Sequence, residues 1–343
     1  MTGSYAFVVM HKSHPGELYA IRKKSPLIAA KTKYGLVFAS DVTAVMSECD
    51  EFYRIPEDTL AVAGEDGLKF FDESGEEVLL KPEKILWSRD ATEKNGFPHY
   101  MLKEINEEPE VIEKTAARFI KDGIPDFAAA FPEIAVATTK AYMTQCEVLY
   151  LAAVYLAYRG GRISRDECER LTSVMREQVP KAVAAVIADN NSKEIAEKIA
   201  GAEHLFYIGR GIDSAVCIEA SLKLKEISYL HSEAYAAGEL KHGTISLVEN
   251  GTPVIAVITD SKLADKTMMN LAEVKARGAA AYVFSSVDGV KSDAKLPHVS
   301  DKEDIFDVFP MLTYLQLLAY HTSLTRGCDV DQPRNLAKSV TVE

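Results

Sequence analysis

The chain has 343 residues, of which 47% are hydrophobic and 26% are charged, as in an ordinary globular protein of two or three domains. Its 51 Asp and Glu residues outnumber its 39 Lys and Arg residues, which gives a formal net charge of −12. This acidic balance argues against nucleic acid or an anionic membrane surface as the main binding partner.

The cysteine and histidine patterns give no sign of a bound metal. The five cysteines are far apart, and the eight histidines show no ligand spacing. We therefore expect reduced thiols, no metal site and no cofactor. The longest apolar run, residues 148–158, is too short to span a bilayer, so we expect a cytoplasmic protein.

Residues 1–92 have the pattern of an antiparallel β region. Short apolar or alternating runs predict strands at 5–10, 17–21, 35–40, 52–55, 60–62 and 68–71. Glycine-containing turns separate the later strands. The result is a meander with few strands for a closed domain.

The pattern changes to helix after residue 93. Residues 93–130 predict a helical segment with a break at 121–126, and residues 131–200 predict a second helical region. The stretch 139–158 is apolar nearly all round, which predicts a buried helix. Ser164 and Glu167 have the spacing of a capping box, and Pro180 interrupts the helix that follows.

Residues 201–343 alternate strand and helix. Strands are predicted at 204–208, 254–259 and 280–285, and helices between and after them, the last at 311–325. Buried strands between amphipathic helices indicate an α/β fold with a doubly wound parallel sheet.

The segment from Glu219 to Gly243 carries the richest chemistry. Glu219, Lys223 and Glu226 lie on one face of one predicted helix. Two carboxylates beside an ammonium can hold a base and a charge that tunes it, although such spacing more often forms a solvated salt-bridge stripe. His242, on a predicted loop, suits proton transfer near neutral pH or a structural hydrogen bond.

Two other segments allow two interpretations each. Gly209-Arg210-Gly211 follows a strand and precedes a helix, which fits an anion cradle or simply a tight turn. The polar tail 329–343 is typical of a frayed end, the interpretation that its composition favours. A functional tail would instead use Lys338 to form an imine with a keto sugar or to assist ring opening.

Five segments resemble a known family: LKLKEISY at 222–229, EAYAAGELKHG at 233–243, DVDQPRNLAKSVTVE at 329–343, EIAVATTKAY at 133–142 and HYMLKEI at 99–105. Together they are similar to the isomerising glutamine–fructose-6-phosphate aminotransferases, which make glucosamine 6-phosphate. The tail is the segment that separates this family from other sugar isomerase (SIS) domain proteins.

The resemblance implies residue roles and partners. Ammonia from glutamine passes to fructose 6-phosphate, and the family joins a glutaminase domain to two sugar isomerase modules. It implies that Glu226 moves a proton between C1 and C2, that Lys338 forms the imine or opens the ring, and that Lys223 and Glu219 support them. His242 would take part in ring opening at a neighbouring subunit's site, which implies a homodimer. Sugar contacts are implied for Val136, Ala137, Thr138 and Ala337.

The sequence also departs from the family pattern. We expect residues 1–92 to be a partial glutaminase-type (Ntn hydrolase-like) domain without the family's cysteine nucleophile, so glutamine hydrolysis is not expected. A gap near residues 127–131 leaves 93–130 as a linker and remnant of the first isomerase module, and 201–343 as the second module. The family's Cys-Gly-Thr-Ser and Ser-Gln-Ser-Gly-Glu-Thr loops are absent from the sequence. The alternative to an active enzyme is therefore a non-catalytic sugar-phosphate-binding or dimerisation fragment.

Overall fold

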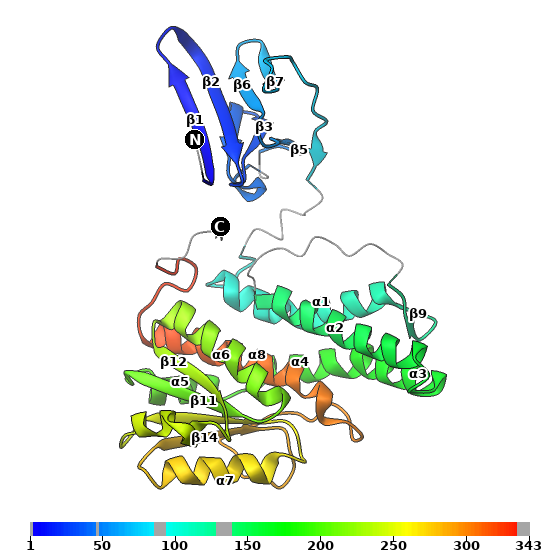
Figure 1. The fold of residues 1–343 in the computed structure, drawn as a ribbon, viewed down its shortest axis with the longest axis vertical. Coiled ribbons are helices and arrows are strands. Elements are labelled where there is room, and N and C mark those ends of the chain that lie inside the picture. The colour runs from blue at the N-terminus through cyan, green and yellow to red at the C-terminus, as the bar shows by residue number, and fades with distance from the viewer. Residues whose placement is uncertain (1–2, 46–47, 86–93, 128–138, 335–343) are drawn as a thin grey trace. The chain divides into compact units, whose positions relative to one another are not determined.

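The computed structural model describes residues 3–45, 48–85, 94–127 and 139–334 (Figure 1). The described residues divide into two compact units, which meet in the sequence at Gly96 and Phe97.

The first unit contains two four-stranded antiparallel sheets, with strand orders β1-β2-β6-β7 and β4-β3-β5-β8. The predicted antiparallel strands are present, but they do not form one meander, because β2 pairs with β6 and the chain between them supplies β3, β4 and β5 of the second sheet. The strand Ile28–Thr32 was not predicted, since its sequence IAAKT does not alternate. The strands are β1 (Tyr5–His11), β2 (His14–Lys23), β3 (Ile28–Thr32), β4 (Gly35–Ala39), β5 (Glu51–Arg54), β6 (Leu60–Gly64), β7 (Gly67–Phe71) and β8 (Glu83–Lys84).

The second unit is built on a five-stranded sheet with the order β12-β11-β13-β14-β15, in which every neighbouring pair is parallel. The predicted α/β class with a doubly wound parallel sheet is confirmed. The strands are β11 (His204–Gly209), β12 (His231–Ala236), β13 (Pro253–Ile258), β14 (Ala280–Ser285) and β15 (Ala294–Lys295).

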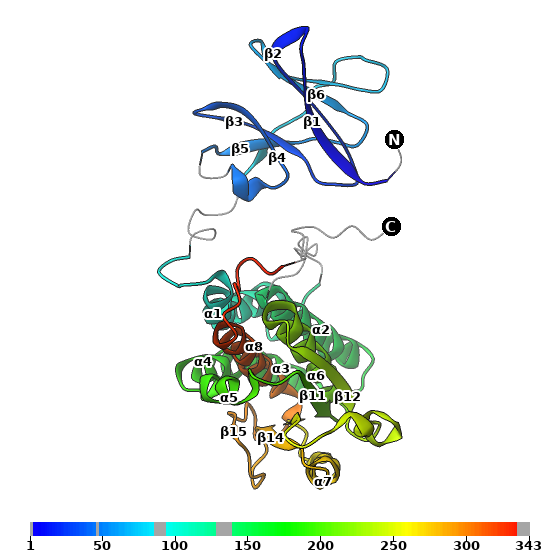
Figure 2. The ribbon, with the colours of Figure 1, turned by 90° about the vertical axis from the view of Figure 1, so that its left-hand side faces the viewer.

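Both faces of this sheet are covered by helices. Helices α6 and α8 lie on one side of the sheet and α7 lies on the other (Figure 2). Along β11, Leu205 and Tyr207 pack into the core shared with α6 and α8, whereas Phe206 and Ile208 pack into the core shared with α7. All four side chains are buried, as expected for a strand between two helical layers. The helices of the described residues are α1 (Tyr100–Phe119), α2 (Thr139–Arg159), α3 (Arg165–Ser173), α4 (Val179–Ala188), α5 (Ser192–Ile199), α6 (Ile212–Ser228), α7 (Ala264–Lys275) and α8 (Val308–Thr325).

The helical layer formed by α1 to α5 matches the sequence signals at its boundaries. The Ser164 hydroxyl accepts a hydrogen bond from the Glu167 N–H at 3.1 Å and caps α3, as predicted. Pro180 lies in the first turn of α4, after a widened turn at Val174–Gln178. The predicted break at 121–126 is a short hairpin between β9 (Ile120–Lys121) and β10 (Ile124–Pro125).

The expectation that α2 is fully buried is wrong. Met143, Glu147 and Leu151 are buried, but Leu149 and Leu156 are each 68% exposed. The reason is that α2 packs mainly against α1 and α3, on one side, so its opposite apolar side is left uncovered by the described residues. No helix in the described part of the chain combines the length and the apolarity needed to cross a membrane.

Candidate active site

The helix α6 is fixed at its start by a tight turn after β11. A Cβ atom on Gly209 would lie 2.6 Å from the Asp213 backbone, so only glycine allows this close approach. The buried Asp213 carboxylate accepts hydrogen bonds from the Thr259 N–H at 2.9 Å and the Thr259 hydroxyl at 2.5 Å, which ties α6 to the end of β13. Arg210 donates to the Asn270 side chain on α7 at 2.8 Å. These contacts fit the tight-turn interpretation of Gly209-Arg210-Gly211.

The carboxyl-terminal half of α6 carries the predicted trio. The Lys223 ammonium lies 2.8 Å from Glu226 Oε2 and 3.8 Å from Glu219 Oε1. The exposed fractions of the side chains are 15% for Lys223, 11% for Glu219 and 24% for Glu226. The trio is therefore largely enclosed and is not the solvated stripe that its spacing alone favoured.

Two side chains of α2, Tyr142 and Cys146, interact electrostatically with Glu219. Burial raises the pKa of the Glu219 carboxyl, and the Glu226 charge adds to the increase, while the Lys223 charge offsets part of it. Burial also raises the pKa of the Tyr142 hydroxyl and the Cys146 thiol, and the charge of Glu219 contributes to both. The arrangement can hold one carboxylate, that of Glu226, in a fixed position with limited access from solvent.

His242 and Glu226 lie near opposite ends of the strand β12. His242 follows β12 in a short 3₁₀ turn, its ring Nδ1 lies 2.9 Å from Glu239 Oε2, and its side chain is 64% exposed. Helix α6 ends just before β12 begins, so Glu226 lies near the amino-terminal end of β12 and His242 lies beyond its carboxyl-terminal end. The six residues of β12 separate them by roughly 20 Å. Within one chain the structure does not bring these two residues together.

The first residues of the tail dock close to Glu226. The Arg334 N–H donates to the Tyr229 hydroxyl at 2.7 Å, and the Arg334 guanidinium lies over the Tyr229 ring, 4.0 Å from its centroid. Tyr229 directly follows the last residue of α6 and is three residues after Glu226. The frayed tail that the composition favoured is therefore wrong for residues 329–334. Tyr229 lies in a segment that carries the family resemblance, but its residue type and spacing alone predict no role for it.

Five predicted site residues, Val136, Ala137, Thr138, Ala337 and Lys338, lie outside the described residues. Within the described ranges, no three His, Cys, Asp or Glu side chains are grouped as ligands for a metal ion.

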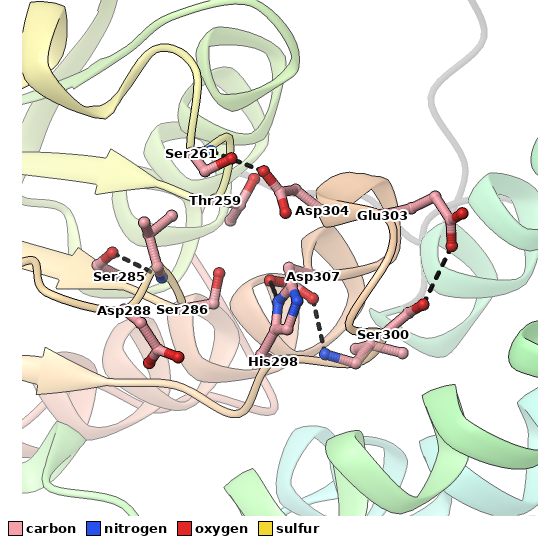
Figure 3. Close-up of polar contacts among 12 residues, drawn as sticks. Thr259, Ser261, Ser285, Ser286, Asp288, His298, Ser300, Glu303, Asp304 and Asp307 are labelled. Carbon is pink, nitrogen blue, oxygen red and sulfur yellow. Dashed lines mark hydrogen bonds and ion pairs between the residues drawn. The ribbon is translucent and has the colours of Figure 1, made fainter.

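Sequence reasoning also missed a His–Asp pair at the carboxyl edge of the sheet, next to Ser285 and Ser286 (Figure 3). His298 Nδ1 lies 2.6 Å from the buried Asp307 Oδ2, and Asp307 Oδ1 accepts from the Val299 N–H at 2.8 Å. Burial lowers the pKa of His298, but the hydrogen bond and charge of Asp307, together with the charges of Asp304 and Asp301, outweigh it, so the pKa is raised. Because these residues come from irregular segments, no spacing rule could reveal the pair. Its contacts hold the loop before α8 in place.

Known proteins with similar sequences show which family this chain resembles. The SIS domain model matches residues 198–299, which include β11 and α6. A glutamine–fructose-6-phosphate aminotransferase [isomerizing] of Clostridium tetani is 34% identical over 456 aligned positions, which cover 99% of this chain and 75% of that protein. The protein of the same name from Clostridium acetobutylicum is 32% identical with the same coverage.

A solved structure shares the fold. The C-terminal domain of glucosamine-fructose-6-phosphate aminotransferase from Francisella tularensis superimposes with a TM-score of 0.61 and 24% identity, over 70% of this chain and 100% of that one. The level of identity with the two clostridial proteins, together with their coverage, shows that this chain belongs to the isomerising glutamine–fructose-6-phosphate aminotransferase family, whose enzymes serve amino-sugar synthesis.

Proposed function

We propose that this chain performs the isomerase chemistry of its family, converting fructose 6-phosphate and ammonia to glucosamine 6-phosphate. The observation that carries the proposal is the enclosed ion pair between Lys223 and Glu226 on α6. In the reaction, ammonia replaces the C2 carbonyl oxygen, which leaves as water. A proton then moves from C1 to C2, and the C1 hydroxyl gives its proton to the imine nitrogen, which leaves an aldehyde at C1 and an amine at C2.

Each described residue of the trio has a separate part in this proposal. Glu226 is the base that takes the proton from C1 and returns it to C2, since a carboxylate held beside both carbons can serve both steps. Lys223 fixes the Glu226 carboxylate, and Glu219 in turn holds Lys223 from the other side.

We assign the imine or ring-opening role to Lys338. It lies four residues after Arg334, which docks one helical turn from Glu226. Four extended residues span up to about 14 Å, so the length of the chain allows Lys338 to reach the Glu226 carboxylate. Sugar contacts by Val136, Ala137, Thr138 and Ala337 remain part of the proposal.

A second copy of the chain completes the proposed site. Because His242 and Glu226 lie near opposite ends of β12, we propose a homodimer in which His242 of one copy serves the Glu226 of the other. Sedimentation at micromolar concentration should show a dimer, and a strictly monomeric protein would contradict the shared site.

A cytoplasmic location fits the free state of all five cysteines.

We propose that residues 201–343 form the second sugar isomerase module, that 131–200 form a helical segment, and that 1–92 and 93–130 keep parts of the glutaminase-type domain and first module. The alignment with the Clostridium tetani protein supports an internal gap: it spans 456 positions, and this chain has 343 residues, so at least 113 positions (456 minus 343) have no counterpart here. Assays with glutamine and with ammonium as nitrogen donor would test whether this chain has glutamine amidotransferase activity.

The test of the function compares Glu226→Gln with Glu197→Gln, which alters an exposed carboxylate on α5. Formation of glucosamine 6-phosphate from fructose 6-phosphate and ammonium should fall at least 100-fold in Glu226→Gln and stay unchanged in the control. Equal activity of the two variants would refute the role of Glu226. If the unaltered chain is inactive but fructose 6-phosphate raises its Tm, the non-catalytic sugar-phosphate-binding alternative holds. Inactivity without a shift would leave only a dimerisation fragment.

A further inference from the structure

The segment Asp329–Arg334 is held in place at several points along its length. Val330 is buried in the main core of the second unit, with 5% of its surface exposed. Asp331 accepts a hydrogen bond from the Tyr100 N–H at 2.8 Å, at the start of α1. Asp329 accepts from the Asp331 N–H at 2.9 Å, which rigidifies the turn. The last contact, that of Arg334, is with Tyr229.

Tyr229 has an unusual backbone conformation for its residue type. Its φ is 57°, in the left-handed region, at the residue that ends α6. Glycine is the usual residue at this place because it adopts such a φ without a steric penalty. A tyrosine here is strained, and strained residues are kept when the side chain has a task that compensates for the cost. In this structure the ring and the hydroxyl of Tyr229 both contact Arg334.

The end of α6 is itself firmly attached, so it offers a rigid support for the segment. The Ser323 hydroxyl donates to the Ile227 carbonyl at 2.9 Å, and Arg326 Nε donates to the Ser228 carbonyl at 2.9 Å. These bonds satisfy carbonyls that a helix end otherwise leaves unpaired. Glu226 is in the same last turn, about 4.5 Å along the helix axis from Tyr229. A segment fixed to Tyr229 is therefore fixed relative to Glu226.

We propose that Tyr229 and Arg334 form a positioning latch, which holds the segment Asp329–Arg334 in register with Glu226. Neither residue touches the reacting atoms in this proposal. The latch rests on the proposed function of Glu226, because its effect on the reaction comes from fixing Arg334, the residue from which the chain continues to Lys338, relative to that carboxylate. Misplacement of a reacting group by about 1 Å lowers rates by about 100-fold.

The decisive variants are Tyr229→Gly and Tyr229→Phe. Glycine removes the latch and also the backbone strain, so the folded protein should keep or raise its Tm while the latch opens. Phenylalanine keeps the ring under the guanidinium and loses only the hydroxyl acceptor. The matched control is Asp122→Gly, which relieves a similar positive φ of 50° in the loop between β9 and β10.

One readout does not depend on activity. Trypsin must bind the Arg334 side chain to cleave after it, and the latch occupies that side chain. Intact-mass spectrometry follows release of residues 335–343. Cleavage after Arg334 should be about tenfold faster in Tyr229→Gly, intermediate in Tyr229→Phe and unchanged in Asp122→Gly. Equal cleavage rates in Tyr229→Gly and the unaltered chain would overturn the latch.

The second readout is the rate of glucosamine 6-phosphate formation. Tyr229→Gly should lower kcat at least tenfold at unchanged Tm, with partial recovery in Tyr229→Phe. A purely structural role predicts instead that activity follows Tm, and an unchanged kcat with faster cleavage would overturn the positioning role. If the unaltered chain is inactive, the proposed function and the positioning role fail together, while the cleavage rates still decide whether the latch exists.

Discussion

Replacing Glu147 by glutamine removes a carboxyl group from the interior of the helical layer in the second unit. The side chain lies on α2, and none of its surface is exposed. Burial raises the pKa of this carboxyl from 4.5 to about 9, and the Ala116 backbone offsets only part of the effect. The folded protein therefore keeps Glu147 protonated at neutral pH, whereas the unfolded chain releases that proton above about pH 4.5.

The sign and size of the effect follow from proton linkage. Between about pH 4.5 and pH 9 the folded state binds one more proton at Glu147 than the unfolded state, so the free energy of unfolding falls as the pH rises. The slope is about 1.4 kcal/mol per pH unit, or about 3 kcal/mol between pH 6 and pH 8. Glu108, also buried and with its pKa raised to about 8, adds a similar slope up to that pH.

The measurement is urea unfolding of the unaltered chain and Glu147→Gln at pH 6 and pH 8, at one protein concentration. Ellipticity at 222 nm follows the second unit, because the α-helices of the described residues lie there. The difference in the free energy of unfolding between the variant and the unaltered chain should shift by about 3 kcal/mol in favour of the variant when the pH is raised from 6 to 8. Any packing cost of the amide is the same at both pH values and cancels in this difference.

The control is Glu113→Gln, on the exposed side of α1, which should show no such difference between the two pH values. Parallel pH profiles for the unaltered chain and Glu147→Gln would mean that the carboxyl is ionised in the folded state. In that case burial would not determine the protonation state of Glu147.

Two further predictions concern the site and its support. His242→Ala and Glu226→Gln chains, each inactive alone, should regain up to about a quarter of the unaltered activity when they are unfolded and refolded together. Half of the dimers would then contain one chain of each kind, and each such dimer would hold one intact site out of two. A mixture as inactive as its components would rule out a shared site. Gly209→Ala should destabilise the second unit by about 2–4 kcal/mol, because the added Cβ would clash with the Asp213 backbone. Gly201→Ala, which has open space around the added atom, should change the stability by less than about 0.5 kcal/mol. Similar denaturant midpoints for the two variants would contradict the predicted clash.

The core of the sheet could be predicted from sequence because its strands carry their own signal. The runs PVIAVI at β13 and AAYVFS at β14 are continuous apolar segments between helical patterns, as expected for buried parallel strands. The strand β12, with the sequence HSEAYA, was missed because an edge strand of small and polar residues has neither a run nor an apolar alternation. Its place in the sheet depends on pairing with β11, which local patterns do not encode.

The trio on α6 could be predicted for a similar reason, since helical spacing alone puts Glu219, Lys223 and Glu226 on one face. Their burial could not, because Glu219 interacts with groups as distant in the chain as Tyr142 and Cys146 on α2. The contact between Tyr229 and Arg334 joins residues 105 positions apart and was equally invisible. Local spacing thus predicts which groups are available, while long-range packing decides how they are buried and oriented.

The distance between Glu226 and His242 is a consequence of topology and not of side-chain conformation. Helix α6 runs back along the sheet from the end of β11 to the start of β12, and His242 is reached only after β12 has crossed the sheet again. A side-chain rotation moves an imidazole by a few ångströms, which cannot close a gap of roughly 20 Å. A site that uses both residues must therefore draw them from two chains, and its activity per chain must rise with protein concentration until the dimer is saturated. If activity per chain stays constant down to concentrations at which sedimentation finds only monomers, His242 takes no part in the chemistry at Glu226.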